Sequence, residues 1–158
     1  MALKQVLNTS ELMTGKDGCL YVEHEGVNIP LVEVGSYSVN MEWQSVDKQP
    51  VGHIDVQSVP TGVRFTLTCT EMVVRDDIWA EEMLATIQKG KFPVYNFQCR
   101  VEKPDGQEQR LMLNNAVPSG NFGLQNVTPG EVVEREMNFR LNDIPAYIST
   151  IASTFNYL

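Results

Sequence analysis

The side chains that most often carry chemistry are few in this chain, and their spacing does not suit it. The chain has two histidines, His24 and His53, which lie far apart without a companion at metal-ligand spacing. Neither accompanies a nucleophile motif such as GxSxG, so a Ser, His and Asp triad has no suitable base. The sequence therefore predicts a protein that is not an enzyme, with no catalytic residues, no metal ligands and no cofactor.

The acidic residues and the cysteines also favour structural roles. Acidic pairs occur at residues 76–77 and 81–82, at the start and on the outer face of a predicted helix, where capping and solubility explain them. The three cysteines, Cys19, Cys69 and Cys99, form no CxxC pair, and their odd number does not suit a disulfide framework. Each lies in a predicted strand, so we interpret them as buried free thiols.

Length and charge limit the remaining classes of protein. A chain of 158 residues fits one domain, residues 1–158, because about 150 residues bury roughly 70% of the unfolded surface. The formal net charge of −8 opposes nucleic-acid binding, which depends on clustered lysine and arginine. The apolar runs are far shorter than the roughly 20 residues of a membrane span, and the first residues lack the apolar core of a secretory signal. We therefore expect synthesis in the cytoplasm and no membrane partner.

One helix and several strands must position any functional side chain. Residues 76–89 predict an amphipathic helix that ends at Gly90 and packs on a sheet through one apolar stripe, Trp79, Met83, Leu84 and Ile87. Alternation of apolar and polar residues predicts antiparallel strands at 19–24, 35–44, 63–72, 95–101, 108–113 and 132–142. In the last of these strands the charged Arg135 shares the apolar face. The fold class is mainly β with one helix.

Two stretches with proline and glycine, residues 45–62 and 114–130, are predicted to be loops. Residues 45–62 also hold apolar side chains, and loops of this length are uncommon in a compact domain unless they have a role. We expect this loop to become ordered against a partner; the alternative is a loop that folds back on its own core. The tail, residues 145–158, is either a short helix or a docking arm.

The order of these elements resembles that of tail tube proteins of contractile phage tails, in the branch of PBSX-like defective prophages and tailocins. The segments that carry the resemblance are LNTSELMTGKDGCLYV, SYSVNMEWQ, IQKGKFPVYNFQCRV and VVEREMNFRL. The resemblance implies an antiparallel β-barrel or sandwich with one packed α-helix, in subunits that form hexameric rings stacked into a tube. In that family a long β-hairpin from each subunit lines the lumen, and loops and termini join the rings.

Applied to this chain, the resemblance makes 35–44 and 63–72 the lumen-lining arms, 45–62 a projecting inter-subunit loop, and 1–16 and 145–158 terminal arms. One of two sets of polar residues would face the lumen: either Ser36, Ser38, Asn40 and Glu42, or Arg64, Thr66, Thr68 and Thr70. The candidates for contacts between rings or subunits are Val46, Val51, His53, Ile54 and Val56.

The function implied by the resemblance is that of a structural subunit in the inner tube of a phage or tailocin tail, made in the bacterial cytoplasm. Its partners would be copies of itself, a sheath protein, a baseplate and a tape-measure protein, with DNA at most passing through the lumen. The alternative is a β-barrel that binds a small ligand or carbohydrate. Tyr37 and Trp43 favour this alternative if the sheet closes around an interior site.

Overall fold

The fold is an antiparallel β-sheet with one helix, and the computed structural model describes residues 18–24, 26–30, 34–71, 79–104, 106–125 and 127–150. The elements are β1 (Gly18–His24), β2 (Val27–Pro30), β3 (Val34–Lys48), β4 (Gln57–Glu71), α1 (Ala80–Gln88), β5 (Tyr95–Glu102), β6 (Glu108–Pro118), β7 (Arg135–Leu141) and β8 (Ala146–Ser149). The strand order is β2-β1-β5-β6-β7-β4-β3, with β8 beside β6. The described residues thus confirm the mainly β fold class.

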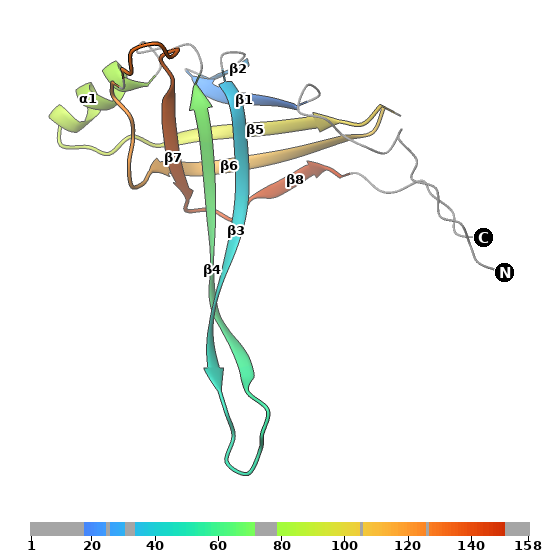
Figure 1. Cartoon of the computed structure of the whole chain (residues 1–158). Coiled ribbons are helices and arrows are strands. Elements are labelled where there is room, and N and C mark those ends of the chain that lie inside the picture. Colours follow the sequence, from blue (N-terminus) through green and yellow to red (C-terminus); the bar gives the residue numbers. More distant parts are fainter. Residues whose placement is uncertain are drawn as a thin grey trace.

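The sheet folds onto itself in two layers. Figure 1 shows β1, β5 and β6 running across the molecule, while β7, β4 and β3 cross them in another direction. The Tyr37 hydroxyl of β3 reaches the carbonyl oxygens of Cys19 in β1 and Arg100 in β5, each at 3.5 Å. The two groups of strands are therefore the crossing layers of a β-sandwich.

An aromatic cluster fills the space between the layers and the helix. Trp79, just before α1, is fully buried, and its ring centroid lies 5.3 Å from that of Tyr95 and 5.9 Å from those of Phe97 and Phe139. The Phe97 and Phe139 centroids are 5.0 Å apart. Tilted and stacked aromatic pairs at these separations stabilise a core beyond the area that they bury. They join β5 and β7, which belong to different layers.

The sheet is not a closed barrel, so the barrel alternative in the sequence prediction is wrong. Closure would require β3 to pair with β2, but these strands are the two ends of the described order. The edge strand β2 has four residues and ends at Pro30, which has no backbone N–H to donate. Trp43 is also 63% exposed, so it cannot line an interior ligand site together with Tyr37.

The helix is shorter than predicted, and only half of its apolar stripe is buried. Asp76 and Asp77 lie outside the described residues, and α1 begins at Ala80. It ends before Gly90, whose φ of +77° suits the left-handed conformation that terminates many helices. Trp79 and Met83 are buried as predicted, whereas Leu84 and Ile87 are 47% and 53% exposed. The expectation that all four side chains pack on the sheet is therefore wrong.

The two long stretches predicted to be loops are partly strands. β3 continues to Lys48 and β4 begins at Gln57, so only the middle of residues 45–62 is a loop. β6 likewise continues to Pro118. In the tail, residues 146–149 form β8 beside β6, so this part is not a helix, and residues 151–158 lie outside the described residues. The N-terminal arm, residues 1–16, lies outside the described residues.

Arg135 is buried in an ion pair that explains its place in an apolar strand. It stands directly opposite Glu71 in the β4–β7 ladder, and both side chains are 2% exposed. The guanidinium Nε and Nη2 donate to Glu71 Oε2 at 2.9 and 2.6 Å. Such short charge-assisted hydrogen bonds compensate for removing both charges from water.

Candidate assembly surfaces

The two predicted sets of lumen residues lie together on one face of the sheet. Cross-strand partners in a ladder share a face, and the pairs are Ser36–Thr70, Ser38–Thr68, Asn40–Thr66 and Glu42–Arg64. On the other side of β4, the threonines pair with three residues of β7, Glu136, Asn138 and Arg140. We call these residues of β3, β4 and β7 the polar face.

Side-chain hydrogen bonds cross the polar face, and its charges are balanced. Thr68 Oγ1 donates to Asn138 Oδ1 at 3.1 Å, and Asn138 Nδ2 donates to the Asn121 carbonyl at 2.9 Å. The four charged members, Glu42, Glu136, Arg64 and Arg140, cancel formally. The net charge of −8 is therefore not located on the described part of this face.

The outer half of the β3–β4 hairpin projects from the body of the molecule (Figure 1). Beyond about Met41 the apolar residues of this ladder have no layer to cover them: Met41 is 55% exposed and Trp43 63%. The predicted dry face of β3 is thus confirmed near the core, where Tyr37 and Val39 are partly buried, and wrong further out. A hairpin this long without a covered face is unusual for an isolated monomer.

The hairpin tip is an ordered turn that presents apolar side chains to solvent. The Gln49 amide Nε2 donates to the carbonyl oxygens of His53 and Ile54 at 3.0 and 3.4 Å, and His53 N donates to Pro50 O at 3.2 Å. The five candidates for contacts between subunits are all exposed here: Val46, Val51, His53, Ile54 and Val56. Their contact role stays a prediction.

A second apolar surface, which the sequence analysis missed, is a cleft of about 520 Å³ beside α1. The exposed helix residues Leu84 and Ile87 line one side, together with Phe92 after the helix. Phe122 and Leu124, which follow β6, line another. We call this surface the helix cleft. The sequence carried one sign of this cleft: the apolar stripe of the helix has four side chains, more than the core of the sheet can bury.

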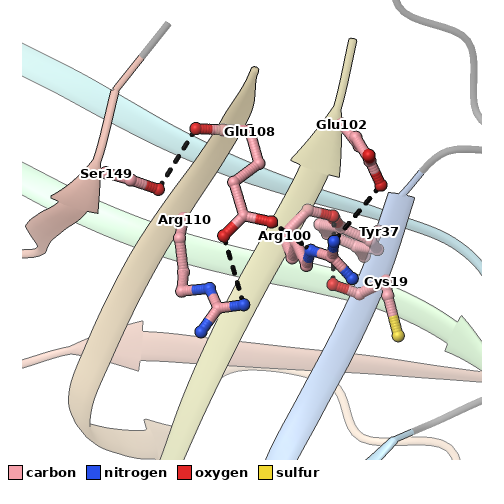
Figure 2. Close-up of polar contacts among 7 residues, drawn as sticks. All are labelled: Cys19, Tyr37, Arg100, Glu102, Glu108, Arg110 and Ser149. Atoms are coloured by element: carbon pink, nitrogen blue, oxygen red, sulfur yellow. Dashed lines mark hydrogen bonds and ion pairs between the residues drawn. The ribbon is translucent and has the colours of Figure 1, made fainter. Parts of the chain in front are cut away.

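The outer face of β5 and β6 carries a charged cluster (Figure 2). Arg100 and Arg110 are cross-strand partners, an arrangement that repulsion disfavours. Glu108 contacts both guanidinium groups, at 2.6 Å from Arg100 Nε and 3.2 Å from Arg110 Nη2, and Glu102 lies 3.2 Å from Arg100 Nη2. The hydrogen bond to Glu108 raises the pKa of Arg100 above its ordinary value. The two glutamates balance the charges of the two arginines, so the cluster stabilises the pairing of the strands and does not form an anion site.

β8 attaches to the same end of the sheet. Ser149 Oγ donates to the Glu108 carbonyl at 3.1 Å (Figure 2), and Tyr147 of β8 lines a cavity of about 230 Å³ with Tyr37, Cys99 and Leu111. Burial raises the pKa of Tyr37 to about 12, so the phenol stays a hydrogen-bond donor.

Among the described residues, no group of three His, Cys, Asp or Glu side chains could hold a metal ion. No helix in that part of the chain could span a membrane.

The three cysteines are free, and we expect them to differ in reactivity. Burial raises the pKa of Cys69 and Cys99 from 9.0 to about 12, whereas Cys19 is only partly buried. At pH 8 the thiolate fraction of the two buried residues is then on the order of 1 in 10,000. Ellman's reagent should label at most one thiol per native chain and all three after denaturation. Rapid labelling of all three in the native state would contradict their burial.

These raised pKa values also predict a loss of stability at alkaline pH. An unfolded thiol ionises near pH 9 and the buried ones only near 12, so the unfolded state releases protons first. The contribution of the two buried thiols to the free energy of unfolding is complete below pH 9 and is lost as the pH rises toward 12. Cys69→Ala with Cys99→Ala should flatten this part of a urea-unfolding pH profile.

The fold and these surfaces define the chain as an open antiparallel β-sandwich with a projecting apolar hairpin and one packed helix. No protein-family model and no curated protein matches the chain. Solved structures with this fold do match it, at low sequence identity.

Three of these structures come from tails and injection machines. A chain of the PVC sheath-tube complex, an extracellular contractile injection system in the extended state, has a TM-score of 0.60 and 14% identity over 88% of this chain and 93% of that chain. A chain of the 6-fold symmetrised anti-feeding prophage baseplate has values of 0.57 and 10% over 94% and 98%. A chain of the gene transfer agent tail with C6 symmetry has 0.51 and 13% over 87% and 100%. These structures confirm, at the level of fold, the resemblance to phage-tail proteins.

Proposed function

We propose that the protein is a non-enzymatic structural subunit of the inner tube of a contractile tail, in a phage or a tailocin, and forms stacked hexameric rings. The observation that carries the proposal is the projecting β3–β4 hairpin, whose apolar side chains are exposed in a single copy. Exposed apolar ladders of this size are a liability in a monomer and become interfaces in an assembly. The sixfold symmetry of structures with the same fold supports a ring of six.

The surfaces divide naturally among the contacts of a tube. The polar face of β3, β4 and β7 suits the lumen, because a hydrated and electrically balanced wall does not bind a passing polymer tightly. The open edges β2 and β3 suit lateral contacts that extend the sheet to neighbouring subunits. The hairpin tip, with Val46, Val51, His53, Ile54 and Val56, suits contacts between rings.

The same proposal determines the other partners and the place of assembly. The protein is made in the bacterial cytoplasm and assembled into a tail-like particle with a sheath protein, a baseplate and a tape-measure protein. A sheath-tube complex among the structures of this fold supports the sheath as a partner. DNA, where the particle carries it, passes through the lumen without a base-specific contact.

Electron microscopy of the native protein tests the proposal. The chain is purified without denaturant and examined by negative stain over a range of concentrations, with sedimentation velocity in parallel. We expect rings or hollow rods of stacked discs as the concentration rises. Particles of monomer size at every concentration would contradict the proposal.

A further inference from the structure

Two apolar surfaces of this chain lie at opposite ends of the molecule. Figure 1 shows the hairpin tip at one end and α1 at the other, on the far side of the sheet. Val51 and Ile54 at the tip are 101% and 93% exposed, and Phe92 in the helix cleft is 86% exposed. The tip therefore cannot cover the cleft of its own copy.

The two ends also carry charges of opposite sign next to their apolar side chains. Lys89 and Lys91 lie between the cleft residues Ile87 and Phe92 in the sequence, and both lysines are exposed. At the tip, Asp55 lies between Ile54 and Val56 and is also exposed. The acidic Asp55 among the apolar side chains of the tip can therefore pair with the two lysines next to the cleft residues.

We infer that the hairpin tip of one copy docks into the helix cleft of a second copy, with Ile54 in the cleft and Asp55 against Lys89 and Lys91. This inference rests on the proposed function and names the two surfaces that join successive rings. A contact that joins two different patches, one at each end of the molecule, is heterologous. When such a contact repeats from copy to copy without closing into a ring, it gives an open stack. The occupant of the cleft is therefore another copy of this chain.

Two variants that each destroy one half of the contact provide the test. Ile54→Asp keeps the cleft and spoils the tip, whereas Phe92→Asp keeps the tip and spoils the cleft. Both side chains are almost fully exposed in one copy, so circular dichroism and urea unfolding should match the wild type. Ile144→Asp, at a residue 79% exposed outside the cleft, is the matched control.

We expect each of the two variants alone to stop before stacking, because its end-to-end affinity falls by at least about tenfold. When the two are purified separately and mixed, the intact tip of Phe92→Asp meets the intact cleft of Ile54→Asp. The mixture should double the mass of the unstacked species in sedimentation velocity and grow no further. The control should stack like the wild type.

The other outcomes overturn the inference in distinguishable ways. Normal stacking by Phe92→Asp would mean that the cleft serves a different partner, while the proposed tube function would stand. Loss of unfolding stability in Phe92→Asp, with stacking retained, would mean that another part of the same chain covers the cleft. A wild-type chain that never assembles would contradict both the inference and the proposed function. A mixture that stays unstacked would contradict the pairing of tip with cleft.

Discussion

Arg135→Met is expected to lower the free energy of unfolding by about 3 to 5 kcal/mol. The substitution keeps an apolar stem of similar length but removes the cation that donates to the Glu71 carboxylate at 2.6 and 2.9 Å, in a side chain that is 2% exposed. A buried charge that loses its partner retains the cost of desolvation without the compensating attraction. Urea unfolding followed by tryptophan fluorescence measures the loss.

The double variant Glu71→Leu with Arg135→Met separates the cost of removing only the cation from the value of the pair. Because it removes both charges and fills the site with apolar atoms, it should recover most of the stability lost in the single variant. Arg140→Met, on the exposed face of the same strand, is the matched control and should change stability by about 0.5 kcal/mol or less. A loss below about 1 kcal/mol in Arg135→Met would show that the pair is not what holds β7 to β4.

The ion pair is also a feature that the sequence pattern alone could not predict. Alternation correctly put Arg135 on the apolar face with Met137 and Phe139, yet it gave no reason for a charge there. The reason lies in the pairing of β4 with β7, which sets Glu71 opposite Arg135 across a separation of 64 residues. Local periodicity carries no information about such long-range register.

The same limit applies to burial. A period of two predicts which residues share a face, but it does not predict what covers that face. Met41 and Trp43 continue the apolar phase of Tyr37 and Val39, but the opposing layer ends before it reaches them. The helix stripe failed in the same way, since Leu84 and Ile87 face the cleft instead of the core.

The outer part of the hairpin was predicted to be a loop because of its proline and glycine residues. Pro60 and Gly62 argued for a loop, because proline cannot donate in a ladder. In the structure Pro60 pairs with Ser45 beside a shift in the β3–β4 register, where a missing donor is tolerated. The register also puts both sets of lumen candidates on one face, so they are not alternatives, and their place in the lumen stays a prediction.

Shortening the hairpin should abolish assembly without unfolding the protein. Gln44 and Gly62 are cross-strand partners, so residues 45–61 can be replaced by Asn-Gly, whose type I′ turn matches the twist of the flanking strands. The removed segment is exposed apart from its pairing with itself. The free energy of unfolding should therefore stay within about 1 kcal/mol of that of the full chain, while rods disappear at every concentration.

The two readouts of this variant test separately whether the outer hairpin supports folding and whether it joins the rings. If the shortened chain unfolds, the outer hairpin supports the core through contacts other than its own ladder. If it folds and still forms rods, the hairpin is not the connection between rings. Ser58→Thr preserves the ladder with a residue suited to an exposed strand, and it should assemble normally. Loss of rods in the shortened chain alone would therefore locate the stacking contact in residues 45–61, because the body of the sandwich is the same in both variants.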